Sequence, residues 1–187
     1  MYFYHYFSKK RGPFRSISDL PIEEARKIWN RMIDYLEERN GLDYQREENI
    51  LIARRHEIRR IIEDDIRQKF AQKGGRIDRE YPYYMRLSND ELPNQGNLDF
   101  YEDGDYIKIP AEKFDTSAVS FTYCDSMQYL DASSYQDGMY QNKVYTFEEI
   151  RRIIDEFGWE HDFGQGKPHL IEAQLWSDTQ IAPYRNS

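Results

Sequence analysis

The distribution of hydrophobic residues along the chain predicts five strands and three helices. Strands are indicated where apolar or aromatic side chains alternate over four to eight residues, and helices where apolar side chains recur every three or four residues. The predicted strands cover 2–7, 81–87, 106–109, 119–124 and 169–176, and the predicted helices cover 21–40, 46–73 and 146–157. This succession predicts an α+β fold, in which a helical hairpin and one short helix pack on a mixed or mainly antiparallel sheet. We expect residues 1–187 to form a single α+β domain.

Local signals support the helix boundaries. The second helix is expected to end at Gly74–Gly75. The third is expected to begin at the capping box T-x-x-E of Thr146–Glu149. The apolar stripe of the second helix is predicted to contain Leu51, Ile58, Ile62, Ile66 and Phe70, with Ile61 beside it.

The stretch Ala118–Met127 combines a strand pattern with small polar side chains. Val119, Phe121 and Tyr123 are expected on one face of a strand, and Ser120, Thr122 and Cys124 on the other. We therefore predict that this strand contributes to the core with one face and to a polar site with the other. The strand at Tyr2–Phe7 is apolar or aromatic on both faces, which indicates a central rather than an edge position.

The polar candidates lie on three different predicted strands. His5 is on the first strand, Ser120 and Thr122 are on the fourth, and Glu172 and Gln174 are on the last. If these strands are neighbours, the five side chains can converge to form a catalytic site. The competing interpretation is that Glu172 and Gln174 are cross-strand hydrogen-bond partners of Ser120 and Thr122.

The candidates resemble the components of ADP-ribosyltransferase sites, in which a His or Arg, a Ser/Thr strand and a late carboxylate bind the substrate nucleotide. The order differs, because Glu172 precedes Gln174, whereas those enzymes place the catalytic Glu two residues after a Glu or Gln. A metal site could be formed by His161, Asp162 and His169, but the spacing of these residues in the sequence matches no zinc-binding pattern. There is no Walker loop and no G-x-G-x-x-G motif, so we predict neither a metal nor a cofactor. Cys124 has no evident activating base.

The charge of the chain limits the classes of molecule that it is expected to bind. The formal net charge is −8, and the segment 88–140 accounts for this excess, with eleven Asp or Glu against Lys108 and Lys113. General nucleic-acid binding is therefore disfavoured. No apolar run is long enough to span a membrane, Met1–Phe7 is too short for a signal peptide, and a single cysteine forms no internal disulfide. We expect a cytoplasmic protein.

Two basic elements interrupt this acidic background. The loop Ser8–Ser18 either holds an anion or is simply solvated. The second helix carries Arg54–Arg55 and Arg59–Arg60. These arginines either pair with nearby acids and extend along the hairpin, or one of them reaches a carboxylate or phosphate in a cleft.

Four motifs occur in order along most of the chain. They are K-G-G at Lys73–Gly75, P-Y-Y-M at Pro82–Met85, S-F-T-Y-C-D-S-M at Ser120–Met127 and I-E-A-Q-L-W at Ile171–Trp176. In this combination the chain resembles a family of small bacterial proteins that has no assigned activity. The resemblance implies a bacterial cytoplasmic protein, and it leads us to expect glycine where Cys124 stands.

Two functions remain open, and the first is the one that we predict, because no single catalytic motif stands without analogy. The first is an interaction module that binds a protein or peptide through a Tyr-rich, acidic surface, because exposed tyrosine gives a large contact area at low entropic cost. The second is a small enzyme that uses a polar cleft containing His5, Ser120, Thr122 and Glu172 on a small molecule.

Overall fold

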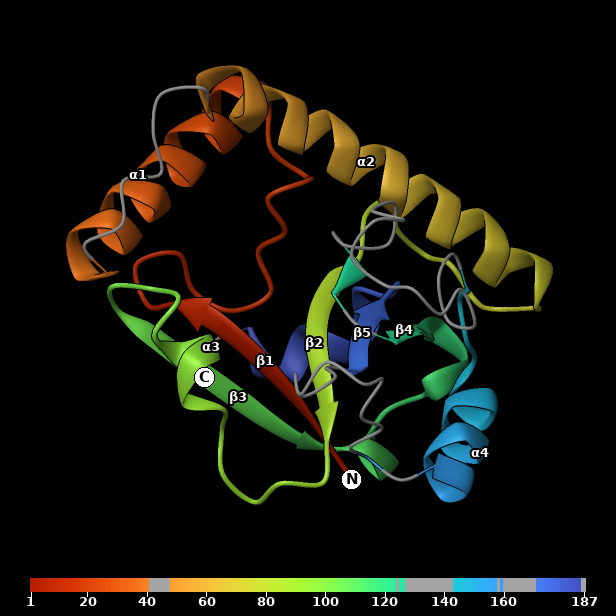
Figure 1. Ribbon diagram of the computed structural model, residues 1–187. Coiled ribbons are helices and arrows are strands. Elements are labelled where there is room, and N and C mark those ends of the chain that lie inside the picture. Colours follow the sequence, from red (N-terminus) through yellow and green to blue (C-terminus); the bar gives the residue numbers. More distant parts are fainter. Residues whose placement is uncertain (41–47, 124, 127–142, 158, 160–170, 186–187) are drawn as a thin grey trace.

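A five-stranded antiparallel sheet forms the centre of the molecule (Figure 1). The computed structural model describes residues 1–40, 48–123, 125–126, 143–157, 159 and 171–185. The strands lie in the order β3-β1-β2-β5-β4, and all four neighbouring pairs are antiparallel. They are β1 (Tyr2–Ser8), β2 (Tyr83–Ser88), β3 (Gly104–Pro110), β4 (Val119–Tyr123) and β5 (Ile171–Leu175). The predicted α+β fold is confirmed, and β1 has the predicted central position.

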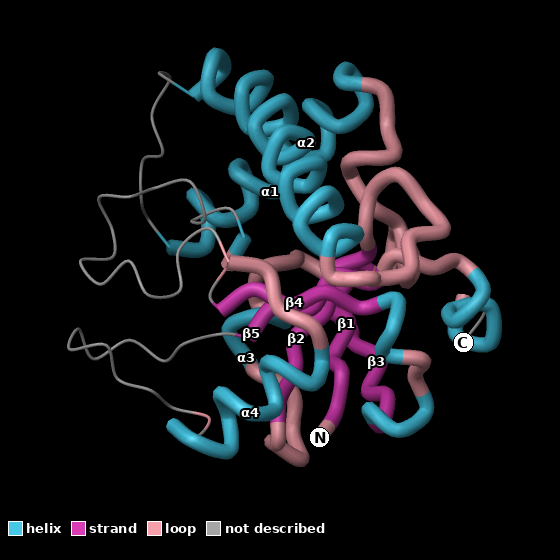
Figure 2. Tube along the Cα trace, turned by 90° about the vertical axis from the view of Figure 1, so that its right-hand side faces the viewer, coloured by secondary structure: helices cyan, strands magenta, loops and turns pink. Residues whose placement is uncertain are grey.

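Helices cover both faces of this sheet. Figure 2 shows the long helices α1 (Ile22–Asn40) and α2 (Glu48–Gln72) on one side of the strands and α4 (Phe147–Phe157) on the other. Helices α1 and α2 contact each other, as expected of consecutive helices. The remaining helices are one or two turns long: α3 (Gln95–Leu98) and the 3-10 segments Ala111–Lys113, Thr116–Ala118 and Thr179–Tyr184.

The strand register divides the sheet into two faces. Directly paired residues project to the same side, and successive residues alternate. The pairs Phe3↔Leu87, Met85↔Ala173 and Phe121↔Ala173 define an apolar face. The pairs Tyr4↔Arg86, Arg86↔Glu172 and Thr122↔Glu172 define a polar face.

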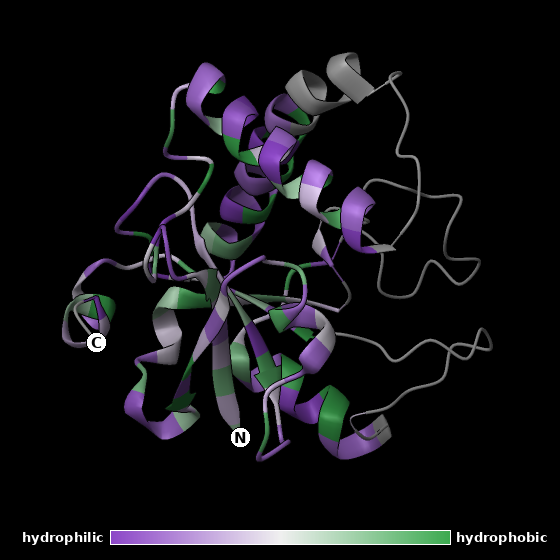
Figure 3. Ribbon diagram, turned by 90° about the vertical axis from the view of Figure 1, so that its left-hand side faces the viewer, coloured by the Kyte–Doolittle hydropathy of each residue, from purple (hydrophilic) through white to green (hydrophobic). Residues whose placement is uncertain are grey.

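Each face has its own hydrophobic core. On the apolar face, Ile150 and Ile154 of α4 pack with Phe3, Phe121 and other buried residues of the sheet. On the polar face, Ile62, Ile66 and Phe70 of α2 pack with Trp176, which directly follows β5. Figure 3 shows hydrophobic and hydrophilic residues alternating along the helices, as expected where each helix buries one side. Ile61, predicted to lie beside the stripe of α2, is 61% exposed.

The local signals at the helix ends form the expected contacts. The backbone N–H of Thr146 donates to Glu149 Oε2 at 2.8 Å, and the N–H of Glu149 donates to Thr146 Oγ1 at 3.3 Å, which completes the predicted capping box. At the end of α2, Gly74 has a φ of +80° and its successor donates its N–H to Phe70 O at 3.0 Å. This left-handed residue ends the helix, as predicted.

The strand that follows Ala118 is an edge strand that is nevertheless covered. All five residues of β4 are buried, and its outer side forms an isolated bridge in which Phe121 and Tyr145 exchange two backbone hydrogen bonds of 2.9 Å. In the part of the chain that the structure describes, no helix is long and apolar enough to cross a membrane.

Candidate functional site

The carboxyl group of Glu172 is the central feature of the polar face. Glu172 lies on β5 between Arg86 of β2 and Thr122 of β4. Its Oε2 atom accepts the backbone N–H of Ser126 at 3.0 Å and the side-chain amide of Gln174 at 3.1 Å. The side chain of Ser126 is a further hydrogen-bonding neighbour of this carboxyl group, and the Glu172 side chain is only partly buried. Residues of β5 and Ser126 thus hold the carboxyl group in place.

The surroundings of Glu172 favour its protonated form. Burial raises the pKa of Glu172 from 4.5 to about 8, and the negative charge of Asp125 adds to this rise. Hydrogen bonds from Ser126 and the positive charge of Arg59 oppose it without cancelling it. Desolvation and a like charge both disfavour ionisation of a carboxyl group. Burial and the neighbouring carboxyl group therefore shift the titration of Glu172 towards the protonated form.

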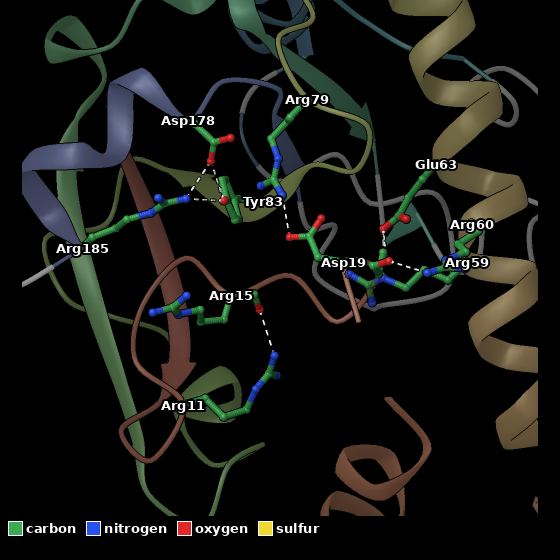
Figure 4. A network of polar contacts seen from close by, with 11 residues as sticks. Arg11, Arg15, Asp19, Arg59, Arg60, Glu63, Arg79, Tyr83, Asp178 and Arg185 are labelled. Carbon is green, nitrogen blue, oxygen red and sulfur yellow. Dashed lines mark hydrogen bonds and ion pairs between the residues drawn. The ribbon is translucent and has the colours of Figure 1, made fainter. Parts of the chain in front are cut away.

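Helix α2 contributes a buried ion pair to the polar face of the sheet, and Figure 4 shows its two residues, Arg59 and Glu63. Arg59 Nε donates to Glu63 Oε1 at 3.0 Å, and these two residues are one helical turn apart. The same oxygen of Glu63 accepts the hydroxyl groups of Ser18 at 2.8 Å and Tyr84 at 2.9 Å. Glu63 is fully buried. Three donors therefore stabilise its charge at one oxygen.

The guanidinium group of Arg59 is held from a second direction. It lies over the ring of Tyr84, 4.3 Å from the ring centroid, which is cation–π geometry. Burial alone would lower the pKa of Arg59, but Tyr84, Glu63 and Glu172 together raise it. The pKa of Tyr84 is raised well above 10 by burial, so its hydroxyl group stays a proton donor. Arg59 is thus a fixed, permanent cation.

The other polar residues of the face are joined in a series of hydrogen bonds. Trp176 Nε1 donates to Ser120 Oγ at 2.8 Å, and Ser120 Oγ donates to Gln174 Oε1 at 2.9 Å. The amide nitrogen of Gln174 then donates to Thr122 Oγ1 at 2.9 Å and to Glu172. Ser120, Thr122 and Gln174 are at most 2% exposed. The predicted cross-strand contacts of Ser120 and Thr122 with Gln174 are present, and Gln174 in turn donates to Glu172.

His5 does not join these residues, and the predicted convergence is wrong in this respect. It lies two residues after Phe3 on β1, and therefore on the apolar face of the sheet. Its Nδ1 bonds to Tyr84 O at 2.8 Å, and its Nε2 accepts the N–H of Phe14 at 2.8 Å. Its ring stacks on Phe14 with centroids 4.2 Å apart. Burial lowers its pKa to about 4. Both ring nitrogens are used, and His5 is structural.

The structure also places the basic elements. Arg59, from the second arginine pair, reaches the buried cluster, and Arg60 donates to the carbonyl oxygens of Ser18 and Leu20 at 2.9 and 3.1 Å. The side chains of Arg54 and Arg55 lie outside the described residues. The same holds for Cys124 and for the metal candidates at 161, 162 and 169. Within the described residues, no group of three or more His, Cys, Asp or Glu side chains could hold a metal ion.

Sequence reasoning identifies Glu172 and its strand partners, and it names Arg59 as one of four arginines that could reach a carboxylate, but it does not identify Glu63. A usable signal is present, because Arg59 and Glu63 are four residues apart on the same helical face as Ile62 and Ile66. An opposite-charge pair within an apolar stripe indicates a buried ion pair. Tyr84 gives no such signal, since it is one tyrosine among sixteen.

Comparison with known proteins adds no relatives. The chain matches no protein-family model, and it has no significant similarity to a curated protein or to a solved structure.

Proposed function

We propose that the protein is a small enzyme that acts on a small polar molecule and uses Glu172 as its general acid–base residue. The observation that carries this proposal is the arrangement of the carboxyl group. Ser126 N and Gln174 Nε2 hold Glu172 Oε2 in place, and the pKa of about 8 lies near neutral pH. A general acid is most effective when its pKa is near the operating pH. Strongly perturbed carboxyl groups concentrate at functional sites.

Each neighbour has a role in this proposal. The donors Ser126 N and Gln174 Nε2 fix Oε2, so that the proton resides on Oε1, from which it passes to the reacting atom of the substrate. Glu172 becomes a carboxylate in this step and recovers a proton from the substrate or from water. Asp125, whose negative charge raises the pKa of Glu172, supplies the second carboxyl group of an acid–base pair. Arg59 orients the substrate through its two Nη nitrogens.

The alternative, an interaction module with a tyrosine surface, has less support among the described residues. The tyrosines of β1 are used inside the molecule: Tyr2 donates to Glu91 at 2.8 Å, Tyr4 donates to Asp90 O at 2.7 Å, and Tyr6 accepts Asn94 N at 2.8 Å. These side chains hold the segment 90–94 against the sheet. Only part of their surface is left for a partner. In line with the family resemblance, we propose a bacterial, cytoplasmic setting for the enzyme.

The proposal also departs from an ADP-ribosyltransferase-like site. Such a site would use His5 as a substrate-binding residue, but His5 lies on the other face of the sheet and both of its ring nitrogens form hydrogen bonds within the protein. The proposed site therefore consists of Glu172, Asp125, Arg59 and Tyr84, with Ser120, Thr122 and Gln174 in supporting positions.

Turnover of a metabolite mixture tests the proposal even though the substrate is not identified. The protein and its Glu172→Gln variant are incubated with a bacterial small-molecule extract at pH 6, 7 and 8, and mass spectrometry follows which compounds disappear and appear. We expect at least one compound that the protein converts and the folded variant does not. Identical metabolite profiles for the two proteins would refute the assignment of Glu172 as the general acid–base residue. Glu148→Gln, on the exposed side of α4, serves as the matched control.

A further inference from the structure

A series of hydrogen bonds connects the indole group of Trp176 to the carboxyl group of Glu172. Trp176 Nε1 lies 2.8 Å from Ser120 Oγ, and Ser120 Oγ lies 2.9 Å from Gln174 Oε1. The amide nitrogen of Gln174 lies 2.9 Å from Thr122 Oγ1 and 3.1 Å from Glu172 Oε2. Trp176, Ser120 and Gln174 are completely buried. The first two contacts are therefore made where water does not compete for the polar atoms.

The chemistry of the indole group fixes the direction of this series. An indole N–H can only donate, so Ser120 Oγ accepts from Trp176 and its own hydrogen points elsewhere. Among the described residues, the other side-chain partner of Ser120 Oγ is Gln174 Oε1, which accepts that hydrogen. The carbonyl end of the Gln174 amide thus faces Ser120, and its nitrogen end faces Thr122 and Glu172.

The orientation of the Gln174 amide matters for Glu172. The two ends of a glutamine amide have nearly the same shape, so packing alone hardly distinguishes its two orientations. In the observed orientation an N–H is donated to Glu172 Oε2, which favours the carboxylate form. In the opposite orientation a carbonyl oxygen would face Oε2, and only a protonated Glu172 could bond to it. That orientation would also leave the buried Ser120 hydrogen without an acceptor, which is costly.

The indole group is itself held firmly in place. Its ring packs with Ile62 and Ile66 of α2. The backbone N–H of Trp176 donates to Ala118 O at 2.9 Å, and its carbonyl oxygen accepts the N–H of Asp78 at 2.8 Å. The indole N–H is therefore a fixed donor, and it excludes the hydroxyl hydrogen of the neighbouring serine from its own direction.

We propose that Trp176 is a positioning residue for Glu172. Its indole N–H orients the Ser120 hydroxyl group, and this group orients the Gln174 amide so that an N–H is donated to Glu172 Oε2. Trp176 therefore acts on the carboxyl group through two other residues. The donated hydrogen bond favours the carboxylate and opposes the rise that burial causes in the pKa of Glu172. The importance of Trp176 for turnover rests on the proposed function, whereas its effect on the pKa of Glu172 does not.

Titration of the Glu172 carboxyl group tests this role without a substrate. Its pKa is measured from the carbon-13 carboxyl signal in NMR spectra between pH 4 and pH 10, and the signal is assigned by its absence from Glu172→Gln. Trp176→Phe removes the N–H, and Ser120→Ala removes the hydroxyl group that transmits its effect. We expect each variant to raise the pKa of Glu172 by about one unit, because the carboxylate loses a donor. An unchanged pKa in either folded variant would overturn the proposal, and Ser120→Ala decides the question if Trp176→Phe does not fold. Charged residues that act on Glu172 or lie opposite it in the sheet are the same in every variant: Asp125, Arg59 and Arg86.

Two further variants separate positioning from a general effect on the core. Trp29→Phe is the matched control, because Trp29 is buried and its Nε1 has no hydrogen-bond partner among the described residues. It should leave the pKa of Glu172 unchanged, and a shift as large as that of Trp176→Phe would overturn the proposal. Gln174→Met removes the donor itself, so Trp176→Phe should cause no further shift in that background. Additive shifts in the double variant would show that Trp176 does not act through Gln174, and would overturn the proposal.

The outcome is independent of the turnover experiment. If metabolites are converted but the pKa of Glu172 is the same in Trp176→Phe, the enzyme proposal stands and the positioning role of Trp176 is wrong. If the pKa shifts as expected and nothing is converted, the positioning role stands and the assignment of Glu172 as the general acid–base residue is wrong.

Discussion

The Glu172→Gln variant should gain stability relative to the unmodified protein as pH rises. The difference in the free energy of unfolding between the two proteins is therefore expected to be larger at alkaline pH than at acidic pH. The folded pKa of Glu172 is raised from 4.5 to about 8, so between these values the folded state binds more protons than the unfolded state. The stability of the unmodified protein therefore falls as pH rises through this window, and the loss is complete only above about pH 8. Glutamine has the same shape and stays neutral, which removes this loss.

The size of the effect follows from the pKa shift. One pKa unit corresponds to about 1.4 kcal/mol, so a shift from 4.5 to about 8 sets an upper limit of about 5 kcal/mol. Glu172 is only partly buried and interacts with a second carboxyl group, and both factors reduce the effect in solution. We expect Glu172→Gln to gain about 2 kcal/mol in relative stability between pH 4.5 and pH 8.5.

Urea unfolding followed by circular dichroism, repeated at half-unit intervals from pH 4 to pH 9, measures this difference. Glu149→Gln is a control of opposite sign. Hydrogen bonds with Lys73 and Thr146 outweigh burial and lower the pKa of Glu149, so its stabilising contribution is present above the unfolded pKa and is lost as pH falls. A stability difference for Glu172→Gln that is flat between pH 4.5 and pH 8.5 would refute the conclusion that the fold raises the pKa of Glu172.

Three further predictions concern the residues that support the site and the fold. Glu63→Gln should lower the free energy of unfolding by about 2–4 kcal/mol, because it leaves Arg59 without its buried partner. A loss of less than about 0.5 kcal/mol, measured by urea unfolding, would contradict this role of Glu63. Because the pKa of His5 in the folded state is about 4, its contribution to stability is lost as pH falls from 6.5 to 4, by at most about 3 kcal/mol. The His5→Gln variant should therefore show a smaller decrease in the free energy of unfolding over this pH range. An equal decrease in the variant and the unmodified protein would exclude a neutral imidazole with both nitrogens hydrogen-bonded. Thr146→Ala should cost about 1 kcal/mol in thermal unfolding, and Thr146→Ser should recover most of it, since both hydroxyl residues cap helices; equal melting temperatures for the two variants would argue against the capping box.

Elements whose signals are local were predicted well from the sequence. The structure contains the strand predicted at 2–7, the described part (119–123) of the strand predicted at 119–124, the capping box at Thr146–Glu149 and the helix end at Gly74. These features depend on side-chain alternation, on a contact across three residues and on one backbone conformation. Each of them is decided within a few residues of the chain, so that the sequence carries the necessary information locally.

The prediction for His5 failed because the face to which a strand residue points depends on register. The alternation within β1 was correct, but it does not state which of its two faces matches the polar face of β5. The pairing of Tyr4 with Arg86, and of Arg86 with Glu172, makes that choice. A shift by one residue would have placed His5 with Glu172. Register across three strands is a property of the assembled sheet.

The sequence by itself determined the succession of strands and helices and the polar character of one side of β4 and β5. Only the tertiary structure decided that Arg59 and Glu63 of α2 pack on Tyr84, on the face of the sheet that carries Glu172, more than one hundred residues later in the chain. Packing of α2 on the sheet brings these charges together and excludes water from them. The resulting desolvation raises the pKa of Glu172, and no single segment of the sequence encodes that environment.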